Sequence, residues 1–409
     1  MNRRFLLLAC LVWMAAFLAS RGATVDTTFS DIASGNMSWG NSTNWSAGDV
    51  PNNGVNSYNV SISASSTISD MGASSTEITS FQTLGDATFQ GSFSGQTLTV
   101  DGDFTQASGT MLVSGPLGLV LNGNTTIDGQ FDLRNGAGFM NNGNLTVNTA
   151  STVADTSLTA PAPRFDLSYN FVNTGVSTWN NQNSVQFANF AVLNTGTMLL
   201  NLSLGNSFIA GTYNQNTTTG VTVVGAGATL QVNQLNLTAG QIFGVGTYNG
   251  SNFVLGNGST GSTVSPGTGP NTAGNLTLAG NLNTIGGVTF AFDLGGTSQG
   301  ANYDLLNLPN NVNFNTTNLT FNFINGFNPS NTDIFTIVST AGNSSGMFAN
   351  APGGVITMPG LGSFNVTVNS NSVTLSGFSA VPEPGRASLL VGFAILAGLF
   401  WRKSQKRLA

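Results

Sequence analysis

Histidine is absent from this 409-residue sequence, and Cys10 is its only cysteine. Residues 24–381 contain no lysine, and they carry 15 acidic side chains against two basic ones, Arg134 and Arg164, a net charge of −13. These absences exclude a Ser–His or Cys–His nucleophile pair, a Cys/His zinc site and a disulfide scaffold from this stretch. Nucleic-acid binding is excluded too, because neutralising phosphates requires clustered cations.

The same stretch is rich in glycine, asparagine, serine and threonine, interspersed with single aliphatic residues. Disordered chains lack apolar residues and carry high charge. Here hydrophobic residues make up 40% of the chain and 28 of them are phenylalanine. The composition therefore predicts a folded body with a substantial core.

The N-terminal segment has the three parts of a secretory signal peptide. Arg3 and Arg4 precede an apolar stretch over residues 5–19, and small residues follow up to Ala23. Residues 1–23 are therefore predicted to be a signal peptide, removed by signal peptidase after export through the Sec machinery. A permanent membrane anchor is the alternative interpretation.

The C-terminal segment combines a rigid motif, an apolar run and a basic end. Val381-Pro382-Glu383-Pro384 comes first, and both prolines lack an N–H and have a fixed φ, so this segment is expected to be extended. Residues 387–401 are apolar and would form a membrane helix about 22 Å long, short for a core of about 30 Å. The predicted cytoplasmic stop consists of Arg402, Lys403, Lys406 and Arg407.

This arrangement over residues 380–409 resembles the PEP-CTERM sorting signal of Gram-negative bacteria. The resemblance implies that a membrane transpeptidase, an exosortase, reads Pro382-Glu383-Pro384. It also implies a precursor anchored in the cytoplasmic membrane by its C-terminal helix and then delivered to the cell surface or the extracellular space.

Between these ends, aliphatic residues alternate with threonine, asparagine or serine. Examples are Thr97-Leu98-Thr99-Val100, Asn144-Leu145-Thr146-Val147 and Ser372-Val373-Thr374-Leu375. Alternation with period two predicts half-buried strands, and no helical stripe is found. The body is expected to be all-β.

The strand patterns recur at a roughly constant interval, of the length that one coil of a repeat protein occupies. Leu98, Leu121 and Leu145 are interpreted as equivalent positions, and Leu230 and Leu276 as two intervals apart. Such a period predicts a parallel β-helix or β-solenoid over residues 24–264, with an irregular register between residues 149 and 194. A β-sandwich, which shows the same alternation, remains the alternative.

Residues 265–379 are predicted to form a C-terminal β module. The stretches Val288-Thr289-Phe290-Ala291-Phe292-Asp293-Leu294, Tyr303-Asp304-Leu305-Leu306 and Asp333-Ile334-Phe335-Thr336 are similar to the terminal module beside autotransporter-associated β-strand repeats. An autotransporter would continue into an outer-membrane barrel, whereas the sorting-like tail follows here. A second, shorter stretch, Trp39 to Pro51, is similar to the opening of large secreted β-solenoid surface proteins.

Two sets of residues are candidates for chemistry. Trp39 and Trp45 offer flat aromatic faces for a glycan, or they cover the open end of the solenoid. A second set is acidic, with one arginine: Asp101, Asp103, Asp128, Asp132 and Arg134. These residues suit turns, a Ca²⁺ site or the carboxylates of a polysaccharide-cleaving enzyme, and turns are the preferred interpretation.

The sequence thus predicts a non-enzymatic, exported structural protein of the cell surface or extracellular matrix, associated with exopolysaccharide or biofilm as the resemblance implies. No catalytic residue, cofactor or metal is expected. The alternatives are an adhesin for a specific glycan and a polysaccharide-degrading β-helix enzyme.

Overall fold

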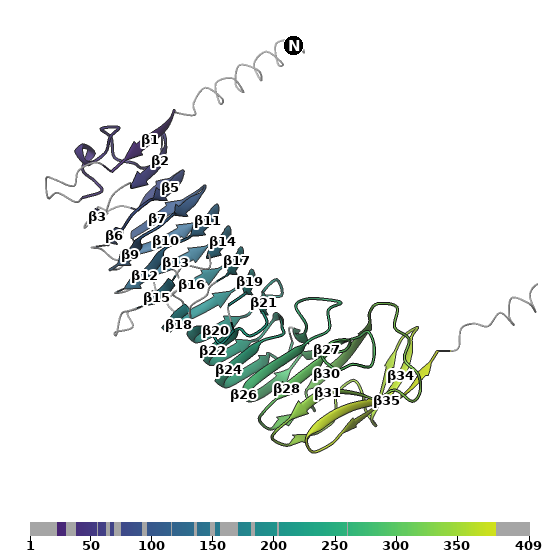
Figure 1. Ribbon diagram of the computed structural model, residues 1–409. Coiled ribbons are helices and arrows are strands. Elements are labelled where there is room, and N and C mark those ends of the chain that lie inside the picture. Colours follow the sequence, from purple (N-terminus) through teal and green to yellow (C-terminus); the bar gives the residue numbers. More distant parts are fainter. Residues whose placement is uncertain are drawn as a thin grey trace, which may run out of the picture.

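The computed structural model describes residues 23–29, 38–54, 56–62, 66–68, 75–91, 96–115, 117–134, 137–147, 152–155, 171–180, 185–202, 204–259 and 261–381. Within them the protein is nearly all-β, as predicted, and the 3₁₀ turn η1, Ser42–Asn44, is the one helical element. Strands of successive turns of the chain lie one above another along an elongated body (Figure 1). The expected signal peptide and membrane helix fall outside the described residues, apart from Ala23.

The first sheet is parallel throughout and receives one strand from each turn of the chain. Its 13 described strands are, in order, β1 Thr24–Thr28, β2 Ser57–Ile62, β5 Ser80–Thr83, β8 Phe104–Gln106, β11 Asn124–Ile127, β14 Asn144–Val147, β17 Val176–Trp179, β19 Thr197–Leu200, β21 Val221–Val224, β23 Gly240–Gly244, β25 Ser262–Pro266, β27 Val288–Leu294 and β30 Thr317–Phe323. We call it the one-strand sheet.

The second sheet begins as two parallel columns of short strands. One column is β3 Ser66–Ile68, β6 Ala87–Gln90, β9 Thr110–Ser114, β12 Gln130–Arg134 and β15 Thr152–Asp155. The other is β4 Thr76–Ile78, β7 Gln96–Val100, β10 Leu117–Leu121, β13 Gly138–Asn141 and β16 Phe171–Asn173.

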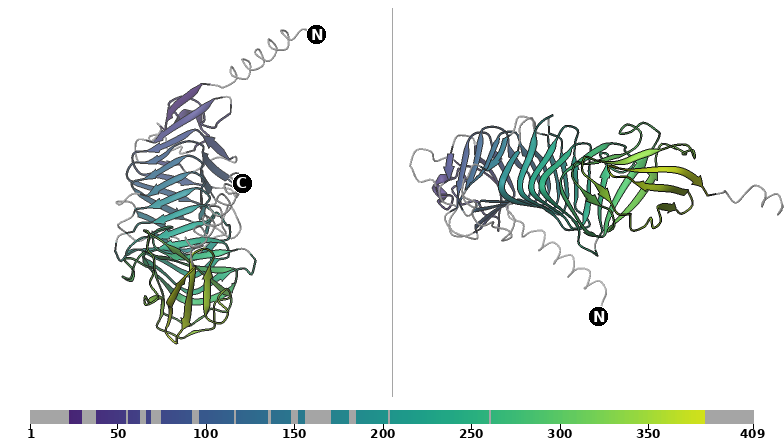
Figure 2. Two further views of the ribbon diagram at one scale, coloured as in Figure 1. Left: turned by 90° about the vertical axis from the view of Figure 1, so that its right-hand side faces the viewer. Right: turned by 90° about the horizontal axis from the view of Figure 1, so that it is seen from below.

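Both columns converge on one longer strand, β18, Val185–Asn194, which pairs with β15 and with β16. From there each turn adds a single strand: β20 Ser207–Gln215, β22 Thr229–Leu237, β24 Thr247–Gly256, β26 Asn275–Gly286 and β28 Leu305–Leu308. We call this the long-strand region. Figure 2 shows the stack from two further directions, and the arrangement is compatible with a β-solenoid.

The strand pattern repeats from turn to turn as predicted, but the residues predicted to be equivalent in successive turns are wrong. Leu98 pairs with Leu119 in the next turn, whereas Leu121 pairs with Val100. Leu145 lies in the other sheet, opposite Thr125. The error arises because both sheets repeat the same aliphatic alternation, so the sequence pattern occurs more than once in each turn.

The second pair of expected equivalents is displaced by two positions. Leu230 pairs with Tyr248, and Tyr248 pairs with Leu278 rather than with Leu276. Leu276 and Leu278 both point inward, since both are buried. A shift of two positions keeps every side chain on its own face, so alternation alone does not distinguish these registers.

The irregular segment predicted between residues 149 and 194 lengthens one turn. The turn that leads from Leu145 to its register partner Ser177 is much longer than the one that leads from Thr125 to Leu145. The strands on either side of this longer turn remain parallel and in register. The stack therefore continues through the irregularity.

Both parallel sheets continue across residue 265, because β27 pairs with β25 and β26 pairs with β24. In the last part of the chain the strands no longer pair only in parallel. This part contains β31 Phe335–Thr340, β33 Val355–Met358, β34 Gly362–Val368 and β35 Ser372–Ala380, with the small pair β29 Val312–Asn313 and β32 Ser344–Ser345. Pairings β31–β35, β33–β34 and β34–β35 are antiparallel and finish the second sheet (Figure 1).

The core consists of inward-facing aliphatic and aromatic side chains that stack from turn to turn. Phe81 and Phe104 are register partners with ring centroids 5.3 Å apart and nearly parallel planes. Phe139 and Phe171 repeat this arrangement at the same centroid distance. Each turn thus buries its apolar face against its neighbours, as expected where no single turn is stable alone.

Glycines make the corners beside the one-strand sheet. Gly102, Gly123, Gly143, Gly175 and Gly196 follow one another in successive turns. A Cβ atom on any of the last four would overlap the carbonyl oxygen of the preceding glycine in the column. The close approach of backbone to backbone therefore requires glycine at this corner.

Candidate functional site

The predicted sorting residues lie at or beyond the end of the described chain. Val381 is the last described residue; it is exposed, and its N–H donates a 3.2 Å hydrogen bond to the Leu361 carbonyl. The rest of the motif and the basic stop are outside the described residues. None of the described residues belongs to a helix long and apolar enough to cross a membrane.

Trp39 and Trp45 are part of the core. They are 1% and 2% exposed, their ring centroids are 4.6 Å apart, and Trp45 also packs on Phe29 beside β1. The Trp39 indole N–H donates to the Pro51 carbonyl at 3.0 Å, and that of Trp45 to the Trp39 carbonyl at 2.9 Å. Because neither ring has an open face, the structure contradicts a direct glycan contact and favours the alternative, a cover over the end of the stack.

The acidic residues chosen from the sequence lie at corners and along a strand. Asp101 and Asp103 flank Gly102 at the corner between β7 and β8, and Asp128 follows β11. Asp132 and Arg134 belong to β12. Asp101 accepts a hydrogen bond from the Asn122 amide at 2.9 Å, and Asp103 one from the Asn124 amide at 3.1 Å. Their carboxylates therefore bind asparagine amides of the next turn.

One carboxyl pair was not predicted. The side chain of Glu77, on β4, shares a hydrogen bond with that of Asp101 in the adjacent turn, and both residues are exposed. This hydrogen bond and the negative charge of Asp101 raise the pKa of Glu77. The two positions are separated in sequence by a whole turn of the chain, so only the register of the turns reveals their contact.

The described residues contain no group of three or more acidic, cysteine or histidine side chains suited to holding a metal ion.

Polar side chains on the outer surface form hydrogen-bonded columns that run from turn to turn. On the one-strand sheet, Asn59 donates to Asp26 at 2.8 Å, and Ser80 donates to Asn59 at 2.8 Å. Farther along the same sheet, Asn144 donates to Asn124 at 3.1 Å. Asp26, Asn59 and Ser80 also line a shallow depression of about 270 Å³ over β1, β2 and β5. The outward polar groups of this depression are thus hydrogen-bonded to one another.

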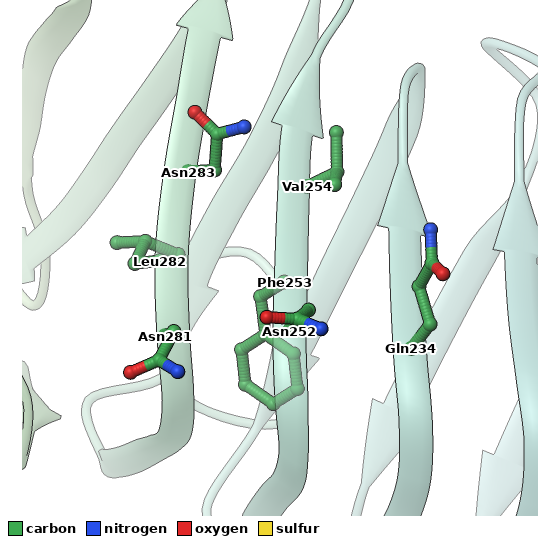
Figure 3. Close-up of a pocket in the computed structure, with 7 residues that line it drawn as sticks. All are labelled: Gln234, Asn252, Phe253, Val254, Asn281, Leu282 and Asn283. Carbon is green, nitrogen blue, oxygen red and sulfur yellow. The ribbon is translucent and has the colours of Figure 1, made fainter.

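A second depression, of about 310 Å³, lies across β22, β24 and β26 in the long-strand region (Figure 3). We call it the amide hollow. Its lining residues are Gln234, Asn252, Phe253, Val254, Asn281, Leu282 and Asn283. None of them is charged, and four of the seven carry a side-chain amide.

Strand register brings the amides of the hollow together. Gln234 pairs with Asn252, and Asn252 pairs with Asn281. A shift of register between Asn249 and Asn252 precedes the second pairing. All three side chains are exposed, whereas Phe253, next to Asn252, is buried. This site could not be predicted from the sequence, because its members come from three different turns of the chain and belong to no motif.

A buried carboxyl lies at the start of the C-terminal part. Asp304 is fully buried, and its two oxygens accept hydrogen bonds from the N–H groups of Gly274, at 2.8 Å, and Asp293, at 2.7 Å. Burial raises the pKa of Asp304 to about 8, and the nearby charge of Asp293 acts in the same direction. The two backbone donors oppose this shift. Asp304 thus links two separate segments of backbone and has no contact with solvent.

Comparison with known proteins adds no family. The chain matches no protein-family model, and no curated protein is significantly similar to it in sequence.

Proposed function

We propose that the protein is an exported, non-enzymatic structural protein of the cell surface or extracellular matrix. Its body is a β-solenoid rod. In this proposal a signal peptide directs export, an exosortase cleaves the chain at Pro382-Glu383-Pro384, and the mature rod associates with exopolysaccharide.

The observation that carries this proposal is the stack itself, with its polar exterior. Parallel strands continue from β1 to β30 in the one-strand sheet, and asparagine, serine and aspartate side chains bond from turn to turn on its outer face. Such a surface offers repeated donors and acceptors to hydrated glycans.

The position of the tail supports the sorting part of the proposal. The last described strand, β35, ends at Ala380, so the Pro-Glu-Pro motif follows the folded part almost directly, after Val381. Two prolines so close together favour an extended stalk beside a folded module. An enzyme in the membrane would reach such a stalk without unfolding the rod.

The polysaccharide-cleaving alternative has one observation in its favour, the Glu77–Asp101 pair. Retaining glycosidases keep their two carboxyl groups about 5 Å apart on either side of the bond that is broken. Glu77 and Asp101 instead interact directly with each other, and Asp101 also accepts a hydrogen bond from the Asn122 amide. The geometry therefore favours the structural role over catalysis.

The sorting proposal is tested by measuring the mass of the mature protein in its native host. We expect a C-terminus close to Pro384. In a variant with Pro382→Ala and Glu383→Ala we expect the uncleaved precursor to accumulate in the membrane fraction. A mature protein that retains Ala409 would overturn transpeptidase processing and leave a simple tail anchor.

The matrix association is tested by fractionating the host with and without synthesis of its exopolysaccharide. We expect the wild-type protein to move from the matrix fraction to the soluble fraction when the polysaccharide is missing. An unchanged distribution would overturn the association.

A further inference from the structure

Two amides of the hollow, Asn252 and Asn281, are used differently from the outward amides of the hydrogen-bonded columns. In other columns an asparagine donates to its neighbour one turn away, as Asn124 does to Asp103, Asn142 to Asn122 and Asn201 to Asn180. Asn252 and Asn281 are register partners too, yet their side chains make no hydrogen bond within the described part of the chain. Their donors and acceptors are available to a ligand.

One side of the hollow is held in place by its own hydrogen bonds. Asn236 donates to Asn214 at 2.8 Å, and Gln234 donates to Asn236 at 2.8 Å. This relay fixes the Gln234 amide at the edge of the hollow while its carbonyl oxygen stays unused. A positioned polar group loses less conformational freedom when it binds a ligand.

Glycines let the backbone lie close to the buried ring beneath the hollow. A Cβ atom on Gly250 or Gly280 would lie within 3.0 Å of the ring of Phe253. Gly250 and Gly280 stand shortly before Asn252 and Asn281 in the same two strands. Backbone at these points thus lies directly against the buried ring, with no side chain between the layers.

The chemistry of the lining selects the ligand class. An amide side chain offers donors and acceptors together, which complements a hydroxyl group that is both. The hollow contains no cation to bind a uronate or a phosphate, and the exported stretch carries a net charge of −13, which repels polyanions. Val254 adds an apolar surface suited to the C–H face of a sugar.

The size of the hollow matches a short piece of an extended chain. It crosses three neighbouring strands, which are spaced about 4.8 Å apart, so it extends over about 10 Å. The amides are therefore spaced at an interval close to the advance per residue of an extended glycan, and successive sugars would meet successive strands.

We propose that the amide hollow is a binding site for a neutral, hydroxyl-rich polysaccharide, whose chain lies across β22, β24 and β26 and bonds to Gln234, Asn252, Asn281 and Asn283. This inference deepens the proposed function, on which it rests, by assigning the contact with the matrix to one surface and one class of glycan.

The test uses the full chain, purified in a detergent without a sugar headgroup. The probes are immobilised hexasaccharides of glucose, mannose, galactose and N-acetylglucosamine, with a hexauronate as the anionic comparison. We expect at least one neutral probe to bind. The double variant Asn252→Ala/Asn281→Ala should bind it at least about tenfold more weakly, because two hydrogen bonds to the ligand are lost.

The matched control is Asn144→Ala, which removes an exposed amide from a bonded column of the one-strand sheet. Its affinity should equal that of the wild type. The proposal is overturned if no neutral probe binds, if only the hexauronate binds, or if the double variant binds as well as the wild type. It is also overturned if Asn144→Ala weakens binding to the same extent.

The two proposals fail in different ways. If the probes do not bind but the host's matrix still retains the protein, the assignment of the hollow is wrong and the structural role stands. If the hollow binds sugars but the protein keeps Ala409 and is absent from the matrix, the proposed function is wrong and the site remains.

Discussion

Asn173 and Asn194 occupy equivalent positions in adjacent turns, and the buried amide of Asn173 donates a 2.8 Å hydrogen bond to the Asn194 side-chain oxygen. The series extends in both directions. Asn141 donates to Asn173 at 2.9 Å, and Asn194 donates to Gln215 at 3.2 Å. Four buried amides thus form an internal ladder, and Gln215 ends it by donating to the Gly220 carbonyl at 3.0 Å.

Breaking this internal ladder should destabilise the stack. Asn173→Ala leaves the Asn194 oxygen without the donor of Asn173 and removes the acceptor of the Asn141 amide. A buried polar group left without its partner costs about 1–3 kcal/mol. We expect the free energy of unfolding to fall by about 2 kcal/mol, measured by urea denaturation followed by circular dichroism.

The exposed column provides the comparison for this variant. Asn144→Ala also removes an asparagine that bonds to the next turn, but solvent replaces the lost hydrogen bond. We expect the free energy of unfolding of Asn144→Ala to stay within about 0.5 kcal/mol of the wild-type value. If Asn173→Ala and Asn144→Ala lost equal amounts of stability, the stabilising effect of the ladder would not depend on its burial.

The glycine corner should tolerate no side chain. Gly143→Ala would place a Cβ atom against the carbonyl oxygens of Gly123 and Asn122. Both are backbone atoms, so relief requires the turns to separate. We expect a loss of stability of about 1–3 kcal/mol, as for overpacking, measured as the shift of the urea midpoint.

Gly269→Ala is the matched control, because a Cβ atom there would meet no atom within 4 Å. Its midpoint should be unchanged or slightly raised, since alanine restricts the unfolded chain more than glycine does. A similar destabilisation by both variants would mean that the corner does not depend on the close approach of the glycines.

Alternation in the sequence was sufficient to predict the strands. Asn144–Val147 is strand β14, and Thr97–Val100 lies within β7. It was not sufficient to predict the register. Inward aliphatic residues recur in both sheets of a turn, so Leu98 and Leu145 look equivalent although they lie in different sheets.

The candidate sites were harder to predict than the fold. An aromatic pair such as Trp39 and Trp45 has the same sequence whether it faces a ligand or closes a core, and burial alone separates the two cases. The amide hollow depends on the register shift before Asn252. Such a shift is set by packing between turns and leaves no local pattern in the chain.

Replacing Asp101 should bring the pKa of Glu77 back towards its ordinary value. The hydrogen bond and negative charge of Asp101 raise the pKa of Glu77. In Asp101→Asn we expect the pKa of Glu77 to decrease towards the ordinary value for glutamate. Carboxyl-carbon NMR over a pH series measures it, and an unchanged pKa would show that Asp101 is not the cause.

The stability of the C-terminal part should depend on pH through Asp304. Burial raises the pKa of this group to about 8, above its ordinary value of 3.8. The folded state therefore binds the proton more tightly than the unfolded state does. The contribution of this group is fully present below about pH 4 and decreases as the pH rises towards 8, by at most about 1.4 kcal/mol per pH unit.

Asp304→Asn tests this dependence, because its amide does not titrate. The variant loses stability at low pH, since one amide oxygen replaces the two oxygens that accept from Gly274 and Asp293. Its free energy of unfolding, measured by urea denaturation at a series of pH values, should fall less steeply between pH 4 and pH 8 than that of the wild type. Parallel curves for the two proteins would show that Asp304 keeps its ordinary pKa and that the two backbone donors outweigh burial.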